Sequence, residues 1–284
     1  MPAKKTPPAF LIFDVESVAD GELVSKIRYP GQALSPEDAI ATYQDELLET
    51  KGTTFIPYTF QVPTAVVIAK VAKDGTLEDL VSLDEPAYRP HVMTQHFWSG
   101  WEAHQCPTWV TFNGRSFDLP LMELAAYRYG IPLGRWFGGS GYNAPRNRFN
   151  KDAHLDLQEM ITNFGASRCN GGLNLIANLI AKPGKAGLTG DRVQGEYDEG
   201  NHQAIADYCR CDVLDTYFVF LRTSTLMGRW TLDHELELVC KAKSWLEDRE
   251  DENEAYAKYL ELWGEWPNPW KDPCDDSEGA GEGS

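Results

Sequence analysis

A short apolar run followed by two acidic residues constrains the fold more than any other part of the chain. Residues 10–13 are apolar without interruption, which is typical of a strand buried on both faces. Side chains two positions apart on a strand share a face, so Asp14 and Glu16 emerge on the same side where this strand ends. The pattern therefore predicts a buried strand that presents two carboxylates together.

Two later segments carry further acidic side chains. Residues 112–120 (FNGRSFDLP) contain Asp118, and residues 208–212 (YCRCD) contain Tyr208 and Asp212. The second segment lies in a helical stretch, where positions four apart are neighbours, so Tyr208 and Asp212 face one way. Carboxylates gathered from distant segments repel one another unless a cation lies between them. Because all-oxygen ligation suits Mg²⁺ or Mn²⁺, the three segments predict a divalent-metal site.

The order of these motifs resembles a known family of enzymes. Asp-x-Glu on the first strand, Asn-Gly-x-x-Phe-Asp in the middle and Tyr-x-x-x-Asp on a late helix are similar to the DEDDy-type 3′–5′ exonucleases of the ribonuclease H-like superfamily. Within it the chain is most similar to the stand-alone predicted exonucleases related to the family B DNA polymerase proofreading domain. Further segments that carry the resemblance are 55–57 (FIP), 182–185 (KPGK) with Gly190 and Val193, and 205–209 (IADYC).

The resemblance covers roughly residues 10–265 and implies an α/β fold. The expected architecture is a ribonuclease H-like mixed sheet of about five strands, flanked by helices on both faces and extended by C-terminal helices. The strand and helix patterns of the chain agree with a mixed α/β sheet.

The resemblance also implies a two-metal mechanism, in which cations roughly 3.5–4 Å apart stabilise both oxygens of an in-line displacement. Asp14 would bridge the two cations, which are Mg²⁺ or Mn²⁺. Glu16 and Asp212 would hold the cation that generates hydroxide, and Asp118 would hold the other, partly through water. Tyr208 would orient the attacking water. The implied activity is hydrolysis of nucleic acid with a free 3′ end to nucleoside monophosphates.

Each of these residues also has a structural alternative. Asp118 could cap the helix that follows it, and Tyr208 could be an ordinary core residue. Asp212 could be a solvated helix residue, and Asp215 is the alternative ligand because it lies three positions on and partly shares the face. The motifs taken together favour the metal site over these separate alternatives.

Four further residues are predicted to contact substrate, namely Asn113, Gly114, Phe117 and Lys185. Asn113 and Gly114 directly follow a predicted strand, and glycine allows a ligand to approach the backbone closely, although a simple turn explains the pair equally well. Phe117 is predicted to stack on the terminal base, with core packing as an equal alternative.

Lys185 belongs to a glycine-containing loop with Lys182 and Arg192, from which these cations could touch the phosphate backbone. His154 and Asp156 are two side chains on one strand face that are able to bind a metal. Asp156 could position a metal ligand without binding the metal itself. For this pair a structural role is the favoured interpretation.

The charge predicts weak binding directed at strand ends. The chain has 43 acidic and 26 basic residues, a net charge of −17, whereas proteins that bind phosphates normally have a basic surface. Residues 229–284 carry 16 acidic and 6 basic side chains, so the acidity is concentrated away from the three motifs. No basic stripe stands out elsewhere. We expect single-stranded or frayed ends as the substrate; the residues favour neither DNA nor RNA, and DNA is our prediction.

Other sequence features bear on location. No run of about 18 apolar residues could span a membrane, and the N-terminus lacks an apolar signal core. The six cysteines show no zinc-binding spacing, which predicts free thiols in a reducing cytoplasm.

The expected elements alternate between strands and helices. Ser35 is predicted to cap a helix that begins at Pro36, and Lys73-Asp74-Gly75 to form a hairpin turn. Strands are predicted at 10–16, 64–71, 76–83, 108–112 and 153–157, and helices at 35–50, 90–104, 119–129, 173–181 and 202–222, with two acidic helices in 231–263.

The domain organisation follows from these elements. Residues 1–9 are predicted to be a flexible N-terminus, 10–265 a single exonuclease domain with the acidic helices of 231–265 packed on it, and 266–284 a disordered acidic tail. The alternative function is a nucleic-acid-binding or interaction module that has the exonuclease fold but little or no catalysis. The complete set of Asp14, Glu16, Asp118, Tyr208 and Asp212 favours the enzyme.

Overall fold

The computed structural model describes residues 6–184 and 192–271. Lys185 and Gly190 lie outside the described residues, as do the outer parts of the predicted flexible N-terminus and acidic tail.

A five-stranded mixed sheet with the order β3-β2-β1-β4-β5 forms the centre of the molecule. The central strand β1 pairs antiparallel with β2 and parallel with β4, and β5 continues the parallel part beyond β4. This is the ribonuclease H-like α/β fold that the family resemblance implies. The strands are β1 (Phe10–Ala19), β2 (Gln61–Val71), β3 (Leu77–Ser82), β4 (Thr108–Thr111) and β5 (His154–Asp156).

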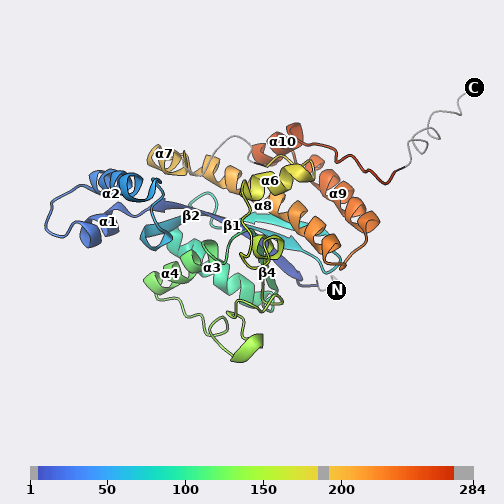
Figure 1. The fold of residues 1–284 in the computed structure, drawn as a ribbon, viewed down its shortest axis with the longest axis horizontal. Helices are drawn as coiled ribbons and strands as arrows, with labels where there is room; N and C mark the ends of the chain where they lie inside the picture. The colour runs from blue at the N-terminus through green and yellow to red at the C-terminus, as the bar shows by residue number, and fades with distance from the viewer. Residues whose placement is uncertain (1–5, 185–191, 272–284) are drawn as a thin grey trace, which may run out of the picture.

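Helices cover both faces of this sheet (Figure 1). The 25-residue helix α8 (His202–Leu226) packs on β1 and β2 from one side, while α3 (Pro90–Ala103) and α4 (Asp118–Tyr129) pack on β2 from the other. An aromatic core lies between α3 and the sheet, where the rings of Phe97 and Trp109 stack with centroids 4.4 Å apart. The buried apolar runs in the strands therefore receive a helix layer on each side.

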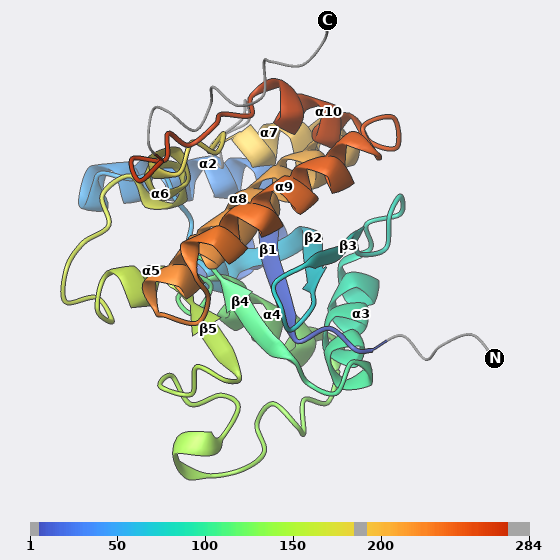
Figure 2. The same cartoon turned by 90° about the vertical axis from the view of Figure 1, so that its right-hand side faces the viewer.

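The predicted C-terminal helices are present as α9 (Leu232–Glu247) and α10 (Glu254–Glu261), and both pack against α8 (Figure 2). The face of α9 that is fully buried consists of Glu235, Leu238, Ala242 and Leu246. One oxygen of the Glu235 carboxylate, Oε1, accepts a hydrogen bond from Arg222 of α8, whose Nε lies 2.6 Å away. These helices thus extend the main hydrophobic core rather than forming a separate one.

The connection between β1 and β2 contains two helices, α1 (Gly21–Arg28) and α2 (Pro36–Lys51), which pack on each other. Helix α2 was predicted, and the Ser35 side chain accepts a hydrogen bond from the Asp38 N–H as the capping pattern requires. The sequence did not predict α1, which is short and is capped by Asp20. The two helices enclose a small core of their own, made by Val24, Tyr29, Ala39, Tyr43, Leu47 and Ile56.

The remaining elements are short and lie between the strands and helices already described. Helix α6 occurs where a helix was predicted, whereas α7 was not predicted. These short elements are η1 (Tyr58–Phe60), η2 (Gly141–Asn143), α5 (Leu157–Ile161), α6 (Gly172–Leu179) and α7 (Val193–Asp198).

In the described parts of the chain, no helix is both long and apolar enough to cross a membrane. The five cysteines within those parts are all free thiols.

Candidate active site

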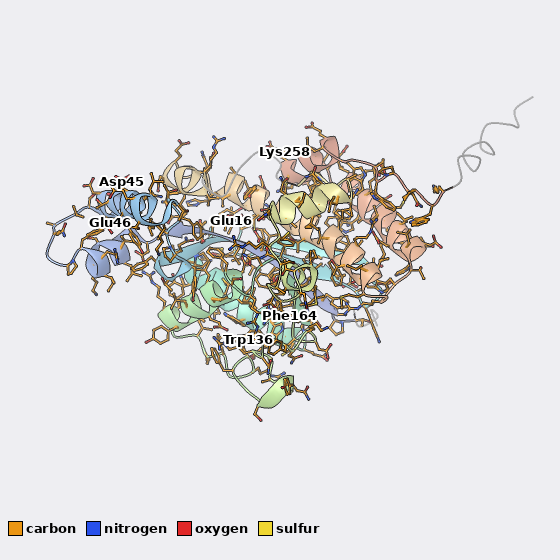
Figure 3. All side chains as sticks on the ribbon, viewed as in Figure 1. Glu16, Asp45, Glu46, Trp136, Phe164 and Lys258 are labelled. Carbon is orange, nitrogen blue, oxygen red and sulfur yellow. The ribbon has the colours of Figure 1, made fainter. Side chains whose placement is uncertain are left out.

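The middle of β1 carries the first two acidic residues of the candidate site. The predicted end of this strand at residue 16 is wrong, because β1 continues to pair with β2 as far as Ala19. Asp14 and Glu16 lie on the same face of the strand, and Asp212 of α8 approaches them from the helix layer. One carboxylate oxygen from each of these three residues lies within 4.8 Å of the others. Figure 3 shows Glu16 near the middle of the molecule, between the C-terminal helices and the α1–α2 segment.

Asp118 adds a fourth carboxylate to this cluster. It is the first residue of α4 and only 4% exposed. Burial, with the nearby charges of Asp156 and Asp212, raises the pKa of Asp118 to about 7. Burial and the charge of Asp118 likewise raise the pKa of Asp14. The N–H of Val15 favours the ionised form of both carboxylates, which indicates that the two side chains lie next to each other.

Tyr208 lies one helical turn before Asp212 and is almost fully buried. Its hydroxyl group is hydrogen-bonded to Asp212, and burial together with the charges of Asp212 and Glu16 raises the pKa of Tyr208. The phenol therefore keeps its proton and can act as a hydrogen-bond donor beside the carboxylates.

Asp215, the alternative ligand, points away from this cluster. It is fully buried, and its Oδ1 accepts a hydrogen bond of 2.7 Å from the hydroxyl group of Tyr259 on α10. The structure therefore brings Asp212, and not Asp215, to Asp14 and Glu16 of β1.

The donor set suits a hard divalent cation. Three carboxylates meet within 4.8 Å, and the charge of Asp118 acts on Asp14. Burial, and then the neighbouring negative charges, raises the pKa values of Asp14 and Asp118. Oxygen ligands of this kind are those that Mg²⁺ and Mn²⁺ prefer. The side chains present thus fit the cation that the sequence predicted.

Cys209 is a neighbour of this cluster that sequence reasoning missed. Its Sγ lies 3.4 Å from the main-chain oxygen of Asp14 and 3.8 Å from Asp14 Oδ2. The thiol is buried, and it can donate a weak hydrogen bond that fixes the orientation of the carboxylate. The sequence signal that could have predicted this contact is the position of Cys209 directly after Tyr208. Adjacent helix residues point about 100° apart, so Cys209 can reach a different part of the same site.

The turn before Asp118 is held by a buried carboxylate from the neighbouring strand. Asp156 accepts hydrogen bonds from the N–H groups of Asn113 at 3.1 Å and Arg115 at 3.0 Å, and it also caps α5. Asn113 adopts a left-handed conformation with φ of 67°. A Cβ on Gly114 would lie 2.6 Å from the Thr111 side chain, so this position requires glycine for packing reasons. A strand-to-helix turn therefore explains why Asn113 and Gly114 occur here. Asp156 holds the backbone of this turn, and the turn positions Asp118.

The other predicted residues have different environments. His154 is fully buried with Nε2 2.8 Å from Thr111 Oγ1, which gives it a structural role. Lys182 is also buried: its Nζ donates to the Gly264 carbonyl at 2.9 Å and lies 3.9 Å from the centre of the Trp263 ring. The prediction that Lys182 contacts phosphate is therefore wrong, whereas Lys185 lies outside the described residues.

Phe117 does not belong to the interior of the core. It is half-buried and contacts the rings of Phe55 and Tyr58, with centroid separations of 5.7 Å and 6.4 Å. Phe117 and Phe55 both line a cavity of about 400 Å³ that Glu16 also borders.

Comparison with known proteins identifies a family and shows similarity to solved structures. Residues 53–263 match the family described as predicted 3′-5′ exonuclease related to the exonuclease domain of PolB. This range includes Asp118, Tyr208 and Asp212 and begins after Asp14 and Glu16. A family B DNA polymerase from the hyperthermophilic archaeon Pyrobaculum calidifontis is similar at 13% identity, with a TM-score of 0.46; the alignment covers 77% of this chain and 24% of the polymerase. No curated protein matches the sequence.

Proposed function

The chain belongs to the family of predicted 3′–5′ exonucleases related to the exonuclease domain of PolB, and on that basis we propose that it is a divalent-metal-dependent exonuclease acting on single-stranded or frayed DNA ends. The observation that carries this proposal is the meeting of Asp14, Glu16 and Asp212, with oxygens within 4.8 Å, beside the buried Asp118. A cluster of this composition repels itself unless cations are bound.

Each residue of the site has a proposed role. Asp14, Glu16, Asp118 and Asp212 would hold the divalent cations. When bound, Mg²⁺ or Mn²⁺ activates water and neutralises the leaving oxygen of the phosphodiester. Tyr208 keeps its proton, so its hydroxyl group orients the attacking water by hydrogen bonding rather than removing a proton from it.

The charge of the protein supports single-stranded substrates. Residues 1–228 carry 27 acidic and 20 basic side chains, so little net positive charge is available to bind and open a duplex, whose opening costs about 1.4 kcal/mol per stacked step. A strand end that is already unpaired avoids this cost. The same scarcity of cations implies that binding depends only weakly on salt.

A 5′-labelled oligonucleotide with either a free or a blocked 3′ terminus tests the proposal. With Mn²⁺ the free strand should shorten one nucleotide at a time and the blocked strand should persist. An Asp14→Ala protein prepared in the same way controls for contaminating nucleases. Equal degradation of both strands would indicate an endonuclease or a 5′-directed enzyme, and binding without shortening would indicate a module that lacks catalysis.

A further inference from the structure

The cavity beside Glu16 is shaped largely by the segment that connects β1 and β2. Its lining includes Glu16 and Ser17 of β1, Phe117 before α4 and Gln194 of α7. The connecting segment contributes Gln44 of α2 and the run 53–56. A volume of about 400 Å³ lies within the range of roughly 300–1,000 Å³ that small-molecule sites occupy. The cavity therefore has room for a nucleoside next to Glu16.

The lining chemistry fits a base and sugar rather than a phosphate. Among the described residues of the lining there is no lysine or arginine, and Glu16 is the only charged side chain. The other polar groups are the amides of Gln44, Gln61 and Gln194 and a few hydroxyl groups. The Gln61 and Gln194 amides are held by hydrogen bonds within the protein. The Gln44 amide can donate to or accept from any base edge, so such a lining tolerates all four bases.

One wall of the cavity is aromatic. The rings of Phe55 and Phe117 contact each other at 5.7 Å between centroids, and Phe55 remains 57% exposed. An exposed large apolar side chain beside a candidate active site indicates a binding surface, and aromatic faces bind unpaired bases by stacking.

The backbone that carries Phe55 is anchored to the site. The neighbouring Ile56 is buried in the small α1–α2 core, and its carbonyl accepts a hydrogen bond from the Gln61 amide. Gln61 in turn accepts a hydrogen bond from Ser17, the residue after Glu16. The backbone next to Phe55 is thus connected to β1 through Ile56 and Gln61.

We propose that the connecting segment is part of the substrate site and that the Phe55 ring stacks on the 3′-terminal base of the strand being shortened. This inference rests on the proposed function and deepens it, because it names the nucleotide that occupies the cavity and the residue that selects an unpaired end. A base within a duplex is stacked and paired, so it cannot reach this wall. Phe55 therefore favours single-stranded or frayed ends over blunt duplex.

The test is a binding cycle that removes the base and the ring in turn. The wild-type protein and Phe55→Ala are titrated with a 5′-fluorescent oligonucleotide that ends in either thymidine or an abasic residue, with Ca²⁺ as the only divalent ion. Binding is followed by fluorescence anisotropy. The wild type should bind the thymidine end roughly 5- to 150-fold more tightly than the abasic end, and Phe55→Ala should lose most of this ratio.

Two further variants distinguish base stacking by Phe55 from the general effect of removing an exposed aromatic ring. Phe55→Tyr keeps the ring and should keep the ratio. Phe137 is also 57% exposed but does not line the cavity, so Phe137→Ala should keep the ratio too. A ratio that is close to one in the wild type, or that is unchanged in Phe55→Ala, would overturn the inference, as would the absence of binding to either oligonucleotide.

A parallel cleavage assay with Mn²⁺ distinguishes this inference from the proposed function. A wild type that shortens the strand but shows no Phe55-dependent ratio leaves the exonuclease intact and refutes the role of Phe55. A wild type that shows the ratio but never shortens the strand supports the base site and refutes the exonuclease.

Discussion

Replacing Asp118 with asparagine is expected to stabilise the metal-free protein while abolishing turnover. Asp118 is 4% exposed and faces other carboxylates, so its negative charge is unfavourable without a bound cation. Asparagine has the same shape and can still accept the hydrogen bonds from the backbone N–H groups of Asp118 and Val15. The substitution therefore removes the buried charge and little else.

The expected magnitude follows from the pKa. Burial raises the pKa of Asp118 from 3.8 to about 7, and 1.36 kcal/mol for each pH unit gives a cost of about 4 kcal/mol for keeping the group ionised in the fold. Because the pKa is raised in the folded state, this cost is absent below pH 3.8 and complete above about pH 7. At pH 5 it amounts to less than about 2 kcal/mol.

Thermal unfolding with EDTA at pH 5 and pH 8 measures this cost. For a domain of this size about 1 kcal/mol shifts Tm by roughly 2 °C, so Asp118→Asn should melt roughly 8 °C above wild type at pH 8 and roughly 3 °C above it at pH 5. Added Mg²⁺ should raise the Tm of the wild type at pH 8 and narrow the difference, because binding to the folded state stabilises it.

Asp84→Asn provides a control of opposite sign. The guanidinium group of Arg89 lowers the pKa of Asp84 to about 2, so this carboxylate contributes stability that is present above pH 3.8 and lost as the pH falls through 2. Asp84→Asn should therefore melt below wild type at pH 8. If Asp118→Asn also melts below wild type at pH 8 in EDTA, the argument from buried like charges is wrong.

Three further predictions concern the same site. Tyr208→Phe should lower kcat by roughly 10- to 10³-fold with little change in KM, because the hydroxyl group only positions water; a variant as fast as wild type would make Tyr208 a packing residue. Asp212→Ala should abolish cleavage, whereas Asp215→Ala should lower Tm through loss of the Tyr259 hydrogen bond and retain cleavage, and the reverse outcome would refute the assignment of Asp212. Ca²⁺ should bind without supporting turnover, since its longer and looser ligand distances do not hold the attacking water, and cleavage that survives EDTA in a pure sample would contradict the metal requirement.

Local patterns were sufficient for most of the secondary structure. The capping residues Ser35 and Pro36 located α2, the Lys73-Asp74-Gly75 turn located the β2–β3 hairpin, and Gly130 ended α4. The sequence missed α1 and α7, which are eight and six residues long. Short helices owe little to intrinsic propensity and depend on tertiary packing, so their sequences carry little periodic signal.

The sequence by itself determined which residue types the site contains and in which order they occur. Periodicity placed Asp14 with Glu16 and Tyr208 with Asp212, because these pairs depend only on the geometry of one strand or one helix. The choice between Asp212 and Asp215 was decided by tertiary structure, since the packing of α8 between β1 and α10 turns one carboxylate to the strand and the other to Tyr259. The burial of Lys182 and the position of Phe55 beside Glu16 also depend on contacts between segments far apart in the chain, which no local pattern encodes.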